Sequence, residues 1–588
     1  MNMKKYLLMS LAALGFAACN QSEDIDSPAH NGEVEESYIA INLMSADKNS
    51  TRKAPDEYGG YEDGTDIERL IKTAYFFFFD ENGNPFSVTA NADNQATAPG
   101  TVDGKNHLSL TIGETTGKTD PNVSDIKKAV LILNTYKGVY PSKIVAVLNW
   151  TPDEDESYSL SELHGLLADI GNDTQGYVMS NSVYMDGTGN MVDAVPLTAA
   201  NIKTSSQDAL NNPVDIYVER TAAKVVLTAS KKIAGTDNIF DTQKNSTSIL
   251  TAGTGIDVYV KLHGWELYND YNTTNLLKNI QNWNVATLGL TWNDIPYYRC
   301  YWAESQTTAL NDQFAWKYEK DNGENVDTYG GFPTQYGFAV AATDDNYATR
   351  STYTYCGENT NGEELRTKVI LKGQLMQKDG ENYEPLELAR WYGTEYAGNL
   401  ALRTAVANSL KYTLYYYDAK NGKYVGIAPE DLQCVAGTLL GNKEYEVGFQ
   451  LSDLEGKGKN REWFQYDSEN GYVSLGAFDT EGNNAINTNE YLKSVEPALL
   501  YAEGQTYYYI DIKHLGTEGK TAEYGVVRNH VYQIDVESIK GYGSPVYIGT
   551  GNLVTPPDYP EEDESSYVAA RINVLSWKVV KQGVDIQP

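Results

Sequence analysis

Cysteine is scarce in this chain, which contains only four in 588 residues. Three of them, Cys300, Cys356 and Cys434, lie far from the N-terminus, so at most one pair can form a disulfide within the chain. Their wide spacing matches no metal-binding motif. We expect buried free thiols, although the spacing leaves open whether any two of the three form a disulfide.

Motifs of enzymes and of metal sites are also lacking. None of the six histidines lies in an HExxH pattern, and the chain has no GxSxG nucleophile elbow and no glycine-rich phosphate loop. Two acidic stretches, residues 321–327 and 479–483, alternate oxygen-bearing side chains but do not complete a twelve-residue calcium loop. We therefore predict no enzymatic activity, no cofactor and no metal ion. Calcium binding and a catalytic pair of carboxylates are alternatives that the spacing leaves open.

Basic residues are in deficit, with 46 Lys and Arg against 80 Asp and Glu and a formal net charge of −34. Such a chain repels nucleic acid and anionic lipid, so neither is an expected partner. Beyond the N-terminus no apolar stretch is long enough to cross a membrane.

The first nineteen residues have the three parts of an export signal. Lys4 and Lys5 precede a short apolar run, residues 6–18, and small residues lie directly before Cys19. The run is too short for a permanent membrane helix. A cysteine after small residues resembles a lipobox, so we predict a lipoprotein precursor with Cys19 lipidated and the membrane contacted only through that lipid. An ordinary signal peptide with an incidental cysteine is the alternative.

The remaining sequence is typical of antiparallel β-structure. It is rich in tyrosine (45) and glycine (50), and short runs of β-branched and aromatic residues alternate with Gly, Asn and Asp. One helix is also predicted, because Ser159 and Glu162 form a capping-box pattern and apolar residues follow at helical spacing up to Gly171. The clearest expected strands are residues 74–80, 128–133, 143–149, 214–228, 255–263, 367–375, 412–417, 505–512 and 526–539.

A short strand near the N-terminus is followed by a protease target. Ile39, Ile41 and Leu43 share one face of the expected strand at residues 37–45. The polar stretch 46–60 then contains the dibasic pair Arg52-Lys53 among small and polar residues.

The C-terminus ends in a strand that follows an acidic, proline-containing segment, residues 555–566, which extends to about 40 Å. Ile572 and Val574 lie on one face of this strand, and Leu575, Trp577 and Val579 lie on the other. We predict a bulge or bend near Leu575, or two short segments that fill successive parts of one groove. The alternative is a terminal strand that returns to its own sheet.

Five features together resemble the fimbrillins of Bacteroidia type V pili, most closely those that form the shaft of the minor fimbrium. The resemblance runs over nearly the whole chain. It implies a mainly β fold, with two transthyretin-like, Greek-key antiparallel β-sandwich domains and few short helices. The features are the lipoprotein signal with Cys19, the basic site at Arg52, and the segments 218–224, 527–536 and 572–578.

The resemblance also implies a division of the chain. It predicts a signal peptide at 1–19, a propeptide with the removable strand at 20–52, an N-terminal domain at 53–232, a C-terminal domain at 233–554, the acidic linker at 555–566 and a donor strand at 567–588.

The function implied by the resemblance is that of a shaft subunit. A trypsin-like protease cuts the outer-membrane lipoprotein precursor after Arg52 or Lys53, and the strand that carries Ile39, Ile41 and Leu43 leaves. The C-terminal strand of an identical subunit then fills the vacated groove, which is a form of β-augmentation. The expected product is an extracellular fimbrium, a linear homopolymer with tip and anchor subunits that serves adhesion and colonisation.

A second hypothesis is a surface lipoprotein that binds glycans and stays monomeric. Residues 264–360 contain several tryptophans among many tyrosines, and aromatic side chains in loops can stack on sugars. They are equally typical of tyrosine-rich β-sandwich cores. A retained lipid anchor would favour this hypothesis. The tryptophans considered for this role are Trp283, Trp292, Trp302 and Trp316.

Overall fold

The structure is a computed structural model of the 588-residue chain, and part of the chain is described in it. Cys19, Arg52, Lys53, the acidic linker, Val579 and Cys300 lie outside the described residues. The described residues are 34–44, 61–62, 65, 67–68, 70–89, 104–111, 129–185, 191–246, 255–280, 302–306, 338–339, 352–440, 446–454, 457–458, 461–477, 486–545 and 567–577.

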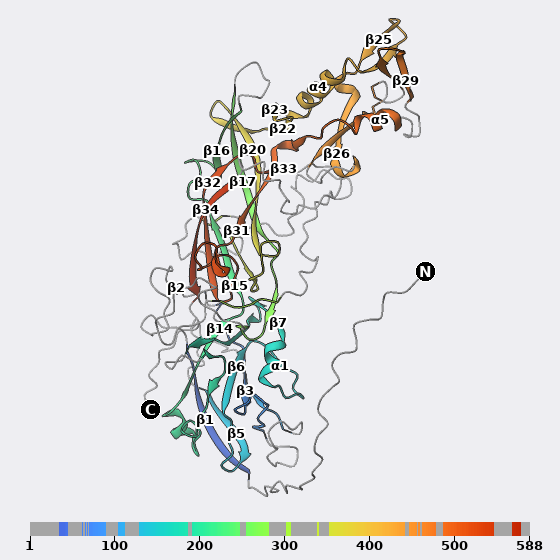
Figure 1. The fold of residues 1–588 in the computed structure, drawn as a ribbon. Coiled ribbons are helices and arrows are strands. Elements are labelled where there is room, and N and C mark those ends of the chain that lie inside the picture. Colours follow the sequence, from blue (N-terminus) through green and yellow to red (C-terminus); the bar gives the residue numbers. More distant parts are fainter. Residues whose placement is uncertain are drawn as a thin grey trace, which may run out of the picture.

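The fold is mainly β, as predicted, and the described elements form three blocks along an elongated molecule (Figure 1). The first block surrounds β1 and β5 at one end. The second contains the long strands β17, β20 and β32, and the third carries α4 and α5 at the other end.

The first block contains a sheet whose interior strand β3 (Thr73–Phe79) holds four consecutive phenylalanines. Phe76 and Phe78 enter the core shared with β1, whereas Phe77 and Phe79 enter a second core on the other face. A continuous apolar run suits a strand with both faces covered. The strand order is β4 (His107–Thr111), β3, β6 (Lys143–Leu148), β10 (Met179–Asn181), β14 (Val214–Arg220), β1 (Val34–Met44) and β5 (Ala129–Tyr136), with β13 (Val195–Pro196) beside β6.

The second block is a sandwich of two sheets around one core. Alternate apolar residues of β15 (Ala223–Thr228) and β32 (His530–Lys540) meet those of β17 (Ile256–Tyr268) and β20 (Lys368–Asp379). One sheet has the order β19 (Tyr353–Cys356), β15, β32, β34 (Tyr567–Trp577) and β2 (Tyr61–Glu62). The other has the order β16 (Ile239–Ser246), β17, β20, β31 (Gln505–Asp511) and β33 (Ser544–Pro545), with β21 (Asn382–Pro385) beside β20.

The third block has its own hydrophobic core within the range expected to form one C-terminal sandwich. Its helix α4 (Gly398–Leu410) was not predicted; Leu402 and Val406 point into that core. The expected boundary at residue 232 follows β15, which pairs with β32 of the second block. The other elements of the third block are β22 (Leu388–Trp391), β23 (Thr394–Ala397), β24 (Leu414–Asp418), β25 (Lys423–Gly426), β26 (Leu432–Ala436), β27 (Val447–Leu451), β28 (Glu462–Asp467), β29 (Gly471–Ala477), β30 (Leu499–Tyr501) and α5 (Ile486–Leu492).

The predicted helix begins where the sequence indicates but is shorter. In α1 (Leu160–Gly165) the Glu162 N–H donates to Ser159 Oγ and the Ser159 N–H donates to the Glu162 carboxylate, which confirms the capping box. The expected continuation to Gly171 is wrong. Residues 167–169 form β7 (Leu167–Asp169), which pairs with β18 (Thr273–Asn275), so a long-range partner replaces the last helical turns.

Short elements complete the described chain. They are β8 (Gly171–Asn172), β9 (Gly176–Tyr177), β11 (Tyr184–Met185), β12 (Met191–Val192), α2 (Ser206–Leu210) and the 3-10 turns η3 (Pro429–Asp431), η4 (Gly437–Leu440), η5 (Ala502–Gly504) and η6 (Thr521–Glu523).

Cys356 and Cys434 are buried free thiols, as expected. Burial raises the pKa of Cys356 well above its ordinary value and that of Cys434 to about 12. Within the described residues, no helix has the length and apolar character needed to span a membrane.

Candidate functional site

β1 lies inside the sheet of the first block, although it is the first strand of the described chain. It runs antiparallel to β5, from the pair Val34–Tyr136 to the pair Ile41–Ala129. Its second half runs parallel to β14, where Ile41 pairs with Val214 and Leu43 with Ile216. An N-terminal segment therefore occupies the space between two strands that are remote from it in sequence.

One face of β1 is buried at every described side chain, and the other face is exposed at Glu36, half-buried at Tyr38 and buried at Ala40. Ile39 and Ile41 are 0% exposed and belong to the same core as Phe76, Leu131 and Ile216. Ala40, on the opposite face, is also completely buried. β1 thus combines large residues on one face with a small residue at the centre of the other.

β5 depends on β1 for its place in the sheet. Among the described strands, β5 pairs with β1 alone. β1 therefore supplies backbone partners to both β14 and β5 and fills the core between them.

β34 lies in the second block rather than beyond it. It pairs antiparallel with β32, from His530–Ser576 to Lys540–Tyr567, and its end runs parallel to β2. The pairing is continuous from Ala570 to Ser576, so the bend expected near Leu575 does not occur in this arrangement. The only irregularity of this pair is a register shift between Val536 and Ser538 of β32. The terminal strand thus lies in its own sheet, although between β32 and β2 and not at an edge.

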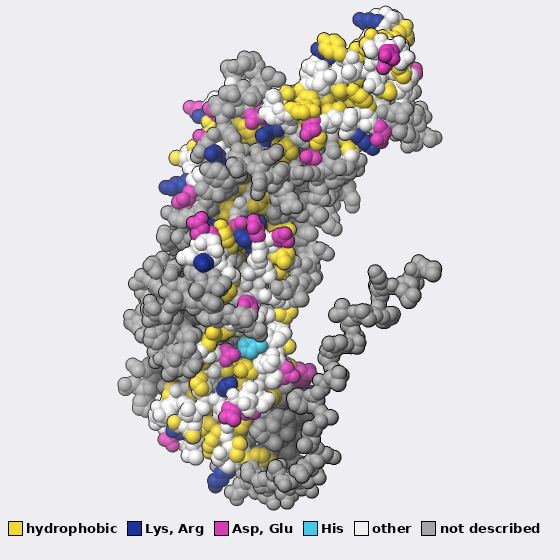
Figure 2. Space-filling model, viewed as in Figure 1, with side chains coloured by type: hydrophobic (Ala, Val, Ile, Leu, Met, Phe, Trp, Pro, Cys, Tyr) yellow, Lys and Arg dark blue, Asp and Glu magenta, His cyan; other side chains and the backbone are white. Residues whose placement is uncertain are grey.

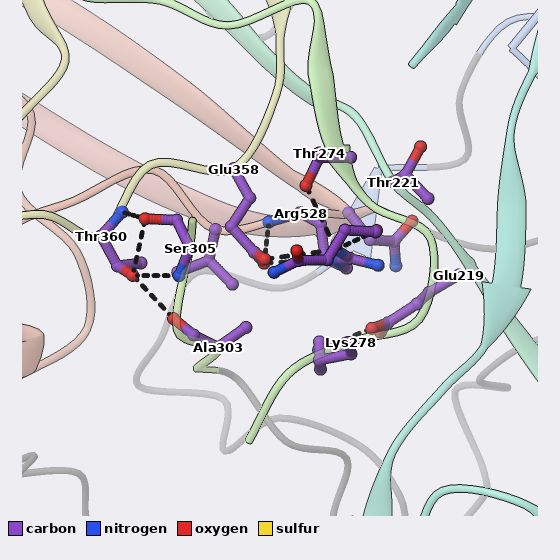
Figure 3. Close-up of polar contacts among 12 residues, drawn as sticks. Glu219, Thr221, Thr274, Lys278, Ala303, Ser305, Glu358, Thr360 and Arg528 are labelled. Carbon is purple, nitrogen blue, oxygen red and sulfur yellow. Dashed lines mark hydrogen bonds and ion pairs between the residues drawn. The ribbon is translucent and has the colours of Figure 1, made fainter. Parts of the chain in front are cut away.

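A group of buried ion pairs joins the first two blocks, where β14 continues into β15. Lys224 Nζ lies 3.0 Å from Glu68 Oε1, and Lys278 Nζ lies 2.6 Å from Glu219 Oε1, with all four side chains 0% exposed. Figure 3 shows Lys278 and Glu219 beside a second cluster around Arg528. Buried charges of this kind are stable only when they are paired.

Arg528 is the centre of that second cluster. Its guanidinium donates to both carboxylate oxygens of Glu358 at 3.2 Å, to the Asn275 carbonyl at 2.7 Å and to Thr274 Oγ1 at 3.2 Å (Figure 3). Arg528 therefore ties the approach to β32 to β18, which itself pairs with β7 of the first block.

Glu68 remains charged despite its burial. Burial on its own raises the pKa of this carboxyl, but the nearby Lys224 and Arg220 and the hydroxyl of Tyr355 outweigh it, so that its pKa lies below the ordinary value. The Arg220 Nε–H also donates to the Glu68 carbonyl at 2.6 Å. Glu68, which follows β2 in the chain, thus contacts Arg220 of the first block and Lys224 of the second.

Sequence reasoning did not single out these charged residues. The segments 218–224 and 527–536 were noted for their resemblance, and the structure brings both to this junction. The available signal was the presence of Glu219, Arg220 and Lys224 within strands that are otherwise apolar, since charged residues are seldom fully buried unless they are paired.

Among the described residues, the histidines and tryptophans considered in the sequence do not form a metal site or an exposed aromatic surface. Within the described residues, no group of three or more His, Cys, Asp or Glu side chains is arranged to hold a metal ion. His530 is buried on β32 and packs against His514. Trp302 is 4% exposed and lies against His514, whereas Trp283, Trp292 and Trp316 lie outside the described residues.

Residues 499–583 match the family model described as major fimbrial subunit protein type IV, fimbrillin, C-terminal. The matched range contains β31, β32 and β34. No curated protein matches the chain.

Several solved structures are similar at low sequence identity. A fimbrilin from Porphyromonas gingivalis W83 has 12% identity and a TM-score of 0.35, with 93% of this chain and 98% of that chain covered. A C-terminally truncated tip fimbrial protein from Porphyromonas gingivalis has 12% identity and a TM-score of 0.27, with 92% and 100% covered. A fimbrial assembly protein from Parabacteroides distasonis has 10% identity and a TM-score of 0.26, with 76% and 100% covered.

Proposed function

We propose that this chain is the shaft subunit of a cell-surface fimbrium, exported as a lipoprotein precursor, cleaved near Arg52 and polymerised by donor-strand exchange. The observation that supports the proposal most is the position of β1 between β5 and β14. The match of residues 499–583 to the C-terminal fimbrillin model agrees with it. In this proposal the lipid on Cys19 anchors the precursor in the outer membrane, and the fimbrium contributes to adhesion and colonisation.

Cleavage is the first step. Residues 45–60 join β1 to β2 and contain Arg52-Lys53. After a trypsin-like protease cuts there, β1 is held only by its backbone pairs and its buried side chains. Ile39 and Ile41 each contribute about 1.5–3 kcal/mol of burial to that attachment, which an incoming strand has to replace.

The incoming strand has to match the two faces of β1. Leu575, Trp577 and Val579 have the same spacing as Ile39, Ile41 and Leu43. If Leu575 and Trp577 take the places of the two isoleucines, Ser576 takes the place of Ala40 in either strand direction.

The other face of the donor fits this position less well. If Ile572 and Val574 replaced Ile39 and Ile41, Asn573 would enter the fully buried Ala40 position and its amide would need new hydrogen-bond partners. Serine is closer to alanine in size. We therefore favour the register in which Leu575, Trp577 and Val579 face the core of the neighbouring subunit.

Donation also requires β34 to leave β32 of its own chain. The antiparallel pairs with β32 are then exchanged for pairs with β5 and β14, of which one set is parallel, because β1 runs antiparallel to β5 and parallel to β14. A subunit with both a cleavage site and a donor strand can accept a strand from one neighbour and donate its own strand to the next. This suits a shaft subunit better than a tip or an anchor subunit.

The test compares the wild-type precursor with the double variant Arg52→Ala/Lys53→Ala. After treatment with a protease that cuts only after arginine, the wild type should start at Lys53 by N-terminal sequencing and form ladders that resist mild detergent. The double variant should remain monomeric, while the control Lys48→Ala, which removes a neighbouring basic residue, should polymerise. Ladders from the double variant, or a cleaved wild type that stays monomeric, would refute the proposal.

A further inference from the structure

The small sheet at the end of the third block carries an aromatic face. The strand order is β25, β24, β28, β29, and the register places Tyr417 opposite Tyr424, Tyr415 opposite Phe464 and Tyr466 opposite Tyr472. The alternate residues Leu414 and Trp463 point into the core of the block. The side of this sheet that is turned away from the core therefore presents six rings: Tyr415, Tyr417, Tyr424, Phe464, Tyr466 and Tyr472.

The six rings pack on one another and remain partly open to solvent. Tyr424 and Tyr472, from the two edge strands, stack with centroids 3.7 Å apart and planes 9° apart. Tyr417, Tyr466 and Tyr472 are 49%, 48% and 38% exposed. Because a solvent-facing side of an antiparallel sheet is normally polar, a continuous exposed aromatic surface indicates a binding surface.

The aromatic face is remote from the strands proposed to assemble the fimbrium. β25 and β29 lie at the far end of the third block, at the opposite end of the molecule from β1 (Figure 1). In the same view, hydrophobic side chains lie at the surface of this block among a few charged ones (Figure 2). A ligand can therefore reach this surface without entering the groove around β1.

The charged groups at the rim of the aromatic face are engaged in their own turns. The Asp418 carboxylate accepts from the Lys420 N–H and from the Asn421 side chain, and these bonds hold its pKa below the ordinary value. Asp467 accepts from the Glu469 and Asn470 N–H groups in the same way, also with a lowered pKa.

The charge distribution opposes an anionic ligand. The formal charge of −34 opposes such a ligand and also the face-to-face stacking of two copies of the chain. Glu462, which lies on the same side of β28 as Phe464, accepts a hydrogen bond from the Ser474 hydroxyl. Phenol hydroxyls and a carboxylate beside apolar rings suit an uncharged ligand with apolar and hydroxyl-bearing surfaces.

We propose that the aromatic face binds neutral carbohydrate. The C–H face of a pyranose ring packs against exposed tyrosine rings, and its hydroxyl groups exchange hydrogen bonds with the phenol oxygens. Tyrosine suits this role because it joins an apolar ring to a polar tip. The site is independent of strand exchange and differs from the tryptophan-rich region considered in the sequence.

The test probes the full-length chain on an array of immobilised neutral oligosaccharides, with sialylated and sulfated forms of the same sugars as comparators. Wild type should bind neutral members. Tyr424→Ser/Tyr472→Ser should weaken this binding at least tenfold, whereas Tyr424→Phe/Tyr472→Phe should retain most of it. Tyr392→Ser is the matched control, because Tyr392 is 71% exposed in the same block but lies outside the aromatic face.

A second measurement needs no variant. The best neutral oligosaccharide of the array should protect Tyr417, Tyr466 and Tyr472 of the wild-type chain from nitration, read by mass spectrometry, and leave Tyr392 reactive. Absence of binding to every neutral sugar, equal binding of charged forms, protection elsewhere only, or protection caused by self-association of the chain would overturn the proposal.

Discussion

Lys224 Nζ lies 3.0 Å from Glu68 Oε1, and neither side chain is exposed to solvent. Lys224 belongs to β15 of the second block, whereas Glu68 lies between β2 and β3. The pair therefore connects the segment that follows the proposed cleavage site with the sheet that holds β34.

Breaking this ion pair should destabilise the chain strongly. Glu68→Gln leaves the Lys224 ammonium buried without its counter-charge, so the free energy of unfolding should fall by about 3–5 kcal/mol in urea denaturation. The double variant Glu68→Leu/Lys224→Met should lose less than the sum of the two single variants. Glu490→Gln, which breaks the exposed pair with Lys493, should change stability by less than about 1 kcal/mol. Equal effects of Glu68→Gln and Glu490→Gln would contradict a buried ionic contact.

Asp270 should make stability depend on pH. Burial raises the pKa of this carboxyl to about 7, above its value in the unfolded chain. The folded state therefore holds the proton more tightly, and the resulting stability is complete below about pH 4 and is lost as the pH rises through about 7. Asp270→Asn should be close to the wild type at pH 3.5 and exceed it at pH 8.5 by on the order of 2 kcal/mol, since the residue is partly exposed.

The measurement for Asp270 is thermal unfolding at both pH values. Asp155→Asn, at a side chain that is 99% exposed, serves as the control and should differ little from wild type at either pH. A stability difference between Asp270→Asn and wild type that does not vary with pH would argue against the raised pKa.

Ile41→Ala should distinguish the precursor from the polymer. The variant removes a completely buried side chain from β1, so the unfolding free energy of the uncleaved chain should fall by about 2–4 kcal/mol. After cleavage and polymerisation the same substitution should have no effect, because β1 has left. Ile132→Ala, at a 47% exposed position of β5, is the matched control. Equal destabilisation of precursor and polymer would show that β1 stays in place.

Ser576 should set the register of the donated strand. A synthetic peptide of residues 567–588 should bind a cleaved subunit and prevent its polymerisation. The Ser576→Ala peptide should act like wild type, whereas Ser576→Trp should bind at least tenfold more weakly, because the Ala40 position has no room for an indole. Undiminished inhibition by the Ser576→Trp peptide would favour the register with Ile572 and Val574 in the groove.

Local sequence signals predicted the elements whose causes are local. The phenylalanine run forms β3 because it fits a strand with two covered faces, and Ser159 starts α1 through hydrogen bonds to its own first turn. The same signals overestimated the length of α1, because Leu167 pairs with Asn275, more than a hundred residues away, in a strand. They also missed α4, which begins at Gly398 after Ala397 without a side-chain cap and is supported mainly by the core of the third block.

For the two candidate assembly strands, β1 and β34, the sequence also predicts the strand itself but not the strands with which it pairs. Alternating apolar residues predicted strands at both ends of the chain, because a side-chain period of two is a property of the strand alone. Which sheet each strand joins follows from long-range pairing. Backbone N–H and C=O groups are the same at every residue, so the local pattern does not decide that β34 pairs with β32. The place of β1 between β5 and β14, and the buried partners of Lys224 and Arg528, come from packing among segments far apart in the chain.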